Sequence, residues 1–196
     1  VPYEAGIANM PEYAMYIEEV LVLGAVAVSM VLLITLMVRI ISILRLSRRY
    51  PGKKTDGITL ISTDHTRAPF SFLNYLFWRT DIPQDTDSGR LIMAHELTHI
   101  RQRHTYDKLA CQLLTCIFWM NPFSWLIQKE LEMVHEFIAD ENAIGEGDTD
   151  AFARMLLQTH NNGQYLVPEH QFFSSPIKRR LTMLQTTSKT KHALSR

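Results

Sequence analysis

The sequence predicts a mainly α-helical chain with a small β-hairpin or sheet, in which one transmembrane helix precedes a single folded domain. Three observations support this prediction. A run of 19 uncharged residues, 20–38, is long enough to cross a bilayer. Two short segments rich in β-branched and aromatic residues follow it, at 58–62 and 68–73. Two later stretches, 91–100 and 132–141, contain no glycine or proline and repeat apolar residues at helical spacing.

The net charge of the 196-residue chain is zero, but its charges are arranged in blocks. Twenty Lys and Arg balance 20 Asp and Glu. Four acids and no base fall in residues 1–19, and six bases and no acid fall in residues 39–54. Eight acids and no Lys or Arg fall in residues 130–150, whereas residues 170–196 carry six bases and no acid. This pattern excludes a uniformly basic nucleic-acid binder and a disordered polyelectrolyte.

The first long element is expected to be a transmembrane helix over residues 17–46. At about 1.5 Å per residue, its uncharged run spans about 28 Å, which matches the hydrocarbon core of a bilayer. Acids precede this run and bases follow it, so the positive-inside rule predicts an external N-terminus and a cytoplasmic C-terminal side. Residues 1–16 are then an extracytoplasmic segment, and residues 47–56 are a basic linker.

A β-hairpin is predicted after the linker. Residues 58–62 and 68–73 have strand composition, and the polar stretch 63–66 separates them. Pro69 cannot donate a backbone hydrogen bond to a neighbouring strand. The second strand is therefore expected at a sheet edge, or with its amide side free.

The motif that carries the chemistry is His95-Glu96-Leu97-Thr98-His99. On a helix, two histidines four residues apart lie on the same face, one turn apart, and can bind one zinc ion. Glu96 is rotated by about 100° from His95, which places its carboxylate beside the open position of the metal. Only about 0.02 matches to this pattern are expected by chance in a chain of this composition, so a metal site is favoured.

A catalytic zinc site normally needs a third protein ligand, and the segment 132–141 offers one. Glu136 and Asp140 are four residues apart on one face of the helix that is expected after Asn121 and Pro122. One carboxylate is expected to bind the metal, and the other to accept a hydrogen bond from a ligand histidine. The spacing alone leaves open which carboxylate does which. The neighbouring His135 is a less favoured ligand because of its angular offset from Asp140.

These motifs resemble the BlaR/MecR-type membrane zinc metallopeptidases. The H-E-x-x-H motif at 95–99, followed by E-x-x-A-D at 136–140, is similar to the gluzincin arrangement. The turn at 118–123 and the basic segment 178–184 select this family among gluzincins. The resemblance covers about residues 17–186 and implies a gluzincin-like zinc metallopeptidase domain at 57–186.

The resemblance also implies a role for each site residue. Zn²⁺ would be bound by His95, His99 and Glu136. Glu96 would be the catalytic base, and Asp140 would orient a ligand histidine. His104, His160, Tyr165, His170 and Arg67 are candidate donors to the developing oxyanion, and none of them is singled out.

The family that this chain resembles consists of sensor-transducers, which have several membrane helices and a cytoplasmic protease domain. The resemblance thus implies a signalling zinc endopeptidase in the cytoplasmic (inner) cell membrane, which cleaves a repressor or itself in the cytoplasm. The expected partners are the lipid bilayer and a protein substrate, such as a transcriptional repressor, with no direct nucleic-acid contact. Residues 187–196 are expected to form a basic tail that leads toward a further membrane helix. A housekeeping membrane zinc protease and a non-proteolytic receptor with a structural zinc site remain open alternatives.

A second uncharged run, 109–127, cannot cross the bilayer once, because a single crossing would separate the two halves of the metal site. It is expected to be a buried helix plus turn, or a hairpin that dips into the bilayer surface. The edge strand at 68–73 could hold substrate as an added strand beside the zinc. Arg180 and its basic neighbours are expected to meet lipid headgroups, and His104 is expected at the surface.

Overall fold

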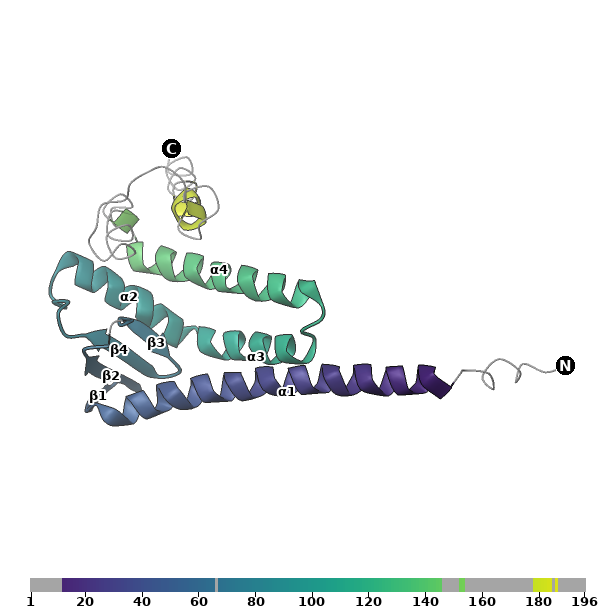
Figure 1. The fold of residues 1–196 in the computed structure, drawn as a ribbon. Helices are drawn as coiled ribbons and strands as arrows, with labels where there is room; N and C mark the ends of the chain where they lie inside the picture. Colours follow the sequence, from purple (N-terminus) through teal and green to yellow (C-terminus); the bar gives the residue numbers. More distant parts are fainter. Residues whose placement is uncertain (1–11, 66, 146–151, 154–177, 185, 187–196) are drawn as a thin grey trace, which may run out of the picture.

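The structure, a computed structural model, describes residues 12–65, 67–145, 152–153, 178–184 and 186. Figure 1 shows one long helix with a small sheet at its C-terminal end and three further helices beside it. The helices are α1 (Glu12–Arg49), α2 (Asp87–Arg101), α3 (His104–Ile117) and α4 (Pro122–Ile144), and the strands are β1 (Gly52–Thr55), β2 (Ile58–Thr63), β3 (Phe70–Phe72) and β4 (Tyr75–Arg79). The described residues are mainly helical with a small sheet, as predicted.

Helix α1 is the candidate membrane helix. It contains the uncharged run 20–38, and its window of highest hydropathy is not buried inside the chain. Arg48 and Arg49 lie in its last turn, where cations interact favourably with the helix dipole. The helix exceeds the predicted range 17–46 at both ends, so part of the expected extracytoplasmic segment is helical. Residues 1–11 and the tail 187–196 lie outside the described residues.

The sheet has the strand order β1-β2-β4-β3. Strands β1 and β2 form an antiparallel hairpin around Asp56 and Gly57, which both have positive φ, as a type I′ turn requires. Strand β2 pairs in parallel with β4, and β3 pairs with β4 in an antiparallel manner. The predicted hairpin between 58–62 and 68–73 is therefore wrong in its pairing, because β4 lies between these two strands.

The ends of the sheet differ from the prediction in one further respect. Residues 52–55 belong to the predicted basic linker, but they form β1 and pair with β2. Strand β3 lies at the opposite edge of the sheet, as the proline at 69 predicts. One edge of β3 therefore has no partner among the described strands.

Helix α2 carries the H-E-x-x-H motif, and local chemistry fixes where it begins. The Thr86 hydroxyl accepts a hydrogen bond from the Gly89 amide at 3.1 Å and so caps the first turn. Gly89 is packed tightly, because a Cβ atom there would lie 2.1 Å from the carbonyl oxygen of Pro83. The motif is thus held at a fixed place relative to the loop that leaves the sheet.

Helices α3 and α4 form an antiparallel hairpin, because a short turn joins them and they contact each other. The Asn121 side chain accepts a hydrogen bond from the Phe123 amide, and Pro122 occupies the first turn of α4. The uncharged run 109–127 is therefore helix, turn and helix. Cys111, Thr115 and Cys116 are buried, but many apolar side chains of this run are exposed, so a simple buried helix is not what the structure shows.

The described core lies around the sheet and α2. The buried side chains of Ile61 and Phe77 pack against the C-terminal half of α1, including Ile40 and Ile43. Leu76 and Trp78, together with Ile100 of α2, form a second cluster that includes more of α2. Helix α2 also contacts α4. These contacts place the motif of α2 between β3 and α4, close to the basic end of α1.

Candidate metal centre

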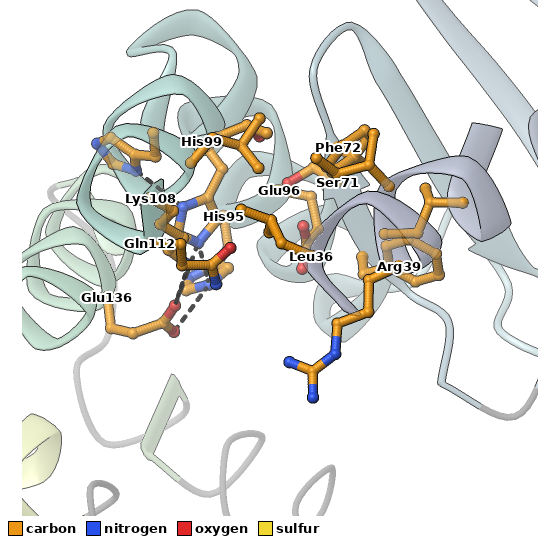
Figure 2. A pocket seen from close by; sticks show the side chains of 16 residues that line it. Leu36, Arg39, Ser71, Phe72, His95, Glu96, His99, Lys108, Gln112 and Glu136 are labelled. Carbon is orange, nitrogen blue, oxygen red and sulfur yellow. Dashed lines mark hydrogen bonds and ion pairs between the residues drawn. The ribbon is translucent and has the colours of Figure 1, made fainter. Parts of the chain in front are cut away.

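The candidate site is a cavity of about 360 Å³ that α1, β3, α2, α3 and α4 line together. Figure 2 shows Leu36 and Arg39 of α1 on one side of this cavity, and Glu136 of α4 on the other. The side chains of His95 and Glu96 reach it from α2. Segments that are far apart in the sequence therefore meet at one cavity.

His95, His99 and Glu136 form a compact cluster whose potential ligand atoms all lie within 4.8 Å of one another. The two histidine Nε2 atoms are 3.2 Å apart. The Glu136 carboxylate oxygens lie 3.6 Å from Nε2 of His95 and 3.5 Å from Nε2 of His99. A tetrahedral zinc ion with bonds of about 2.0–2.1 Å separates its ligands by about 3.4 Å. The three residues fit such an ion.

The ionisation of these three groups also suits metal binding. Burial disfavours the charged ring, but contacts with Asp140 and Glu136 outweigh it and raise the pKa of His95 to about 9. Burial and the positive charge on His95 lower the pKa of His99 to about 3. Burial opposes ionisation of Glu136, yet its contacts with His95 and Arg180 lower its pKa to about 2. At neutral pH only His95 must lose a proton to bind a metal.

Asp140 lies behind His95 and is fully buried. Its Oδ1 atom is 3.0 Å from Nδ1 of His95, although the angle at this nitrogen is not that of a hydrogen bond. The guanidinium of Arg180 binds both oxygens of Asp140, with Nε 2.7 Å from Oδ2, and its Nη1 lies 3.1 Å from Glu136. Of the two carboxylates, Glu136 therefore joins the histidines, and Asp140 faces the far side of the His95 ring.

The contacts of Arg180 correct one expectation. The basic segment was expected to face lipid headgroups, but the Arg180 side chain is only 14% exposed and bridges two carboxylates of α4. Its neighbour Arg179 pairs with Glu130 at the surface. The sequence of three consecutive bases does not predict which side chain is buried, because burial depends on how residues 178–184 pack on α4.

His104 also differs from its expected surface position, since it is 3% exposed. Its Nδ1 atom lies 2.8 Å from Nδ1 of His99, and its Nε2 lies 3.3 Å from Oε1 of Gln102. If Nε2 of His99 binds a metal, Nδ1 of His99 carries the proton and donates it to His104. The ring of His104 must then be neutral, and burial together with the charges of His135 and Lys108 lowers its pKa to about 4.

His135 is not part of the cluster of potential ligands. Its ring is buried and stacks on the ring of His104, with centroids 4.0 Å apart. Its Nε2 atom lies 3.4 Å from Asp107 of α3. His135 therefore packs behind the site. The spacing of five between His99 and His104 did not predict that His104 lies against His99. Residue 103 is in the left-handed region, and α3 begins a new helix axis there.

Glu96 lines the same cavity from the side opposite to Glu136 (Figure 2). Burial raises the pKa of its carboxyl group, against the opposing effects of charged His95 and of a hydrogen bond with Ser71. Ser71 belongs to β3, the edge strand, and also lines the cavity. The structure thus brings the expected base, the expected metal ligands and the expected edge strand to one place.

The other candidate donors are not brought to this cavity by the described structure. Arg67 is exposed, and its amide bonds to the His65 ring. His160, Tyr165 and His170 lie outside the described residues. Lys108, which the sequence did not single out, lies 3.8 Å from Glu136 and lines the cavity.

A sequence model of the family described as BlaR1 peptidase M56 matches residues 82–184. This match covers more than half of the chain, and it includes the H-E-x-x-H motif, Glu136 and Arg180. The chain belongs to the BlaR1 peptidase M56 family. Membership of the M56 family implies that the chain is a metallopeptidase. The long apolar helix α1 is consistent with association with a membrane. No curated protein matches the chain.

Proposed function

We propose that the chain is a membrane-anchored zinc endopeptidase with a cytoplasm-facing active site, which transmits a signal by cutting a repressor or itself. The near-tetrahedral separations among the ligand atoms of His95, His99 and Glu136 carry this proposal. These residues share a cavity with the carboxylate of Glu96. A purely structural zinc site has no need of a carboxylate or a cavity beside it. The acids before the uncharged run 20–38 and the bases after it support the cytoplasmic orientation.

Each residue then has a distinct task. His95, His99 and Glu136 would hold the ion, while Asp140 and Arg180 fix the His95 ring and the Glu136 carboxylate from behind. When bound by these three residues, zinc would supply Lewis acidity for activating water and polarising a peptide carbonyl. The Glu96 carboxylate takes a proton from the attacking water and passes it to the leaving amine. Burial raises the pKa of this carboxyl group, and a higher pKa makes its carboxylate a stronger proton acceptor.

The test uses the whole chain reconstituted in lipid vesicles and loaded with zinc. We expect Glu96→Gln to keep one zinc per chain but to lose cleavage of a mixture of unstructured peptides, and of the chain itself. Glu136→Ala should lose the metal. Glu130→Gln, the same chemical change at the exposed Arg179 pair, is the matched control and should keep both properties. Full cleavage by the Glu96 variant would reject the proposed mechanism, and no cleavage by the zinc-loaded unaltered chain would favour the receptor alternative.

The edge strand suggests how substrate is held. The side of β3 that faces away from β4 has no partner among the described strands, and Ser71 of β3 lines the cavity with Glu96. An extended peptide added along this edge would lie next to the metal ligands. Ser71→Glu should therefore weaken cleavage of the peptide mixture while one zinc per chain remains. An unchanged cleavage rate would count against this binding mode.

A further inference from the structure

The turn between α3 and α4 exposes an apolar surface, which we call the hairpin tip (residues 113–127). Nine of its large apolar side chains are between 47% and 72% exposed: Leu113, Leu114, Ile117, Phe118, Met120, Phe123, Trp125, Leu126 and Ile127. The run 109–128 around it contains no charged residue. A soluble surface rarely shows so many neighbouring apolar side chains, and such a patch normally has a partner.

The position of the hairpin tip indicates what this partner is. Residues 117–121 line a groove together with residues 25, 26, 29 and 30 of α1. Those α1 residues lie inside the uncharged run 20–38, and α3 runs alongside α1 (Figure 1). If α1 spans the bilayer, the tip beside its middle lies at the depth of the hydrocarbon core. The apolar surface of the tip then continues the exposed apolar surface of α1.

Several polar groups of the turn find partners within the protein, as such a depth requires. Inside hydrocarbon, backbone groups must find their partners within the protein. The Asn121 amide donates to the carbonyl of Phe118 at 2.9 Å, and the Ser124 amide donates to the carbonyl of Asn121 at 3.1 Å. The Ser124 hydroxyl also donates to the Phe118 carbonyl. The indole N–H of Trp125 donates to the carbonyl of Trp119 at 2.9 Å, so this ring needs no water.

From these observations we infer that the hairpin tip is inserted among the acyl chains of the bilayer, beside α1. The charge-free part of α3, residues 109–117, is about 13 Å long, and that of α4, residues 122–128, is about 10 Å long. Both lengths are less than half of the hydrocarbon core, which is about 30 Å thick. The tip therefore enters one leaflet without crossing, and Lys108 and Lys129 mark where the hairpin leaves it. This inference rests on the membrane-spanning part of the proposed function, and not on peptidase activity.

Tryptophan emission in vesicles of brominated phosphatidylcholine tests the inference, because bromine on the acyl chains quenches rings that touch them. The chain has three tryptophans, of which Trp119 and Trp125 belong to the hairpin and Trp78 is 2% exposed in the sheet. We expect strong quenching in the unaltered chain. Little quenching is expected in the Trp119→Phe/Trp125→Phe variant, which keeps only Trp78 and leaves the sheet untouched. Adding Val31→Trp to that variant places a reporter on the exposed face of α1 and should restore quenching.

The outcomes separate the two proposals. If the Val31→Trp reporter is quenched but the hairpin tryptophans are not, the hairpin lies in water or against protein, and the inference is wrong. If the hairpin tryptophans are quenched only when the protein is diluted in lipid, a second copy of the chain covers the tip at higher protein density. That result would also overturn the inference. If neither position is quenched, α1 is not in the bilayer, and the membrane anchor of the proposed function fails as well.

Discussion

Replacement of Arg180 by methionine tests how the metal centre is supported from behind. The change keeps much of the apolar stem but removes the guanidinium that bridges Asp140 and Glu136. Asp140 is fully buried, so it would lose its guanidinium partner and keep only the His95 ring as a charged neighbour. Breaking a buried ion pair in this way costs about 3–5 kcal/mol of unfolding free energy. For a domain of this size, that corresponds to a fall in Tm of about 6–20 °C.

The assay is thermal unfolding of the zinc-free chain in detergent, followed by helical circular dichroism. The matched control is Arg179→Met, one residue away, where the lost ion pair with Glu130 is exposed to solvent and contributes little. Adding Asp140→Asn to Arg180→Met removes the stranded charge and should restore part of the lost stability. An Arg180 variant no less stable than the Arg179 variant would refute the reasoning. If Asp140 orients His95 as proposed, the Arg180 variant should also bind zinc about 10–100-fold more weakly.

Three further predictions concern the groups around the metal and the start of α2. His104→Phe removes the partner of His99, a proposed zinc ligand, so zinc affinity measured by chelator competition should fall about 10–100-fold while helical circular dichroism is retained. Since contacts raise the pKa of His95 to about 9, zinc must displace its proton. Calorimetry in buffers of different ionisation enthalpy should detect release of about one proton at pH 7, and zinc affinity should rise with pH until about pH 9. Gly89→Ala should lower stability by about 1–3 kcal/mol, because a Cβ atom there meets a carbonyl oxygen at 2.1 Å. Gly24→Ala, which meets nothing within 4 Å, is its control and should not lower Tm.

Some elements could be predicted from the sequence because their causes are local. The length and apolarity of residues 20–38 predict a helix that can cross a membrane, and α1 contains them. The spacing of four in 95–99 places two histidines on one helix face, and the structure brings their Nε2 atoms to 3.2 Å. The proline at 69 keeps its strand at the sheet edge. In each case the geometry follows from neighbours within a few residues.

Other features depended on contacts between distant segments. The hairpin was predicted between the wrong strands, because the two-residue loop Asp56-Gly57 pairs β2 with a short basic strand and β4 then inserts beside it. The inward turn of Arg180 depends on a buried carboxylate 40 residues away. The burial of His104 depends on the break at residue 103, which turns α3 toward His99.

The sequence by itself determined the candidates for the chemistry: the residues that could bind a metal, the carboxylate next to the first histidine, and the run that could enter a membrane. These properties follow from residue type and from the fixed geometry of a helix. Only the tertiary structure decided that Glu136 joins the histidines while Asp140 and Arg180 lie behind them. It also placed the hairpin tip beside α1. Such choices depend on how α1, α2 and α4 pack together, and packing is a property of the whole chain that no local pattern encodes.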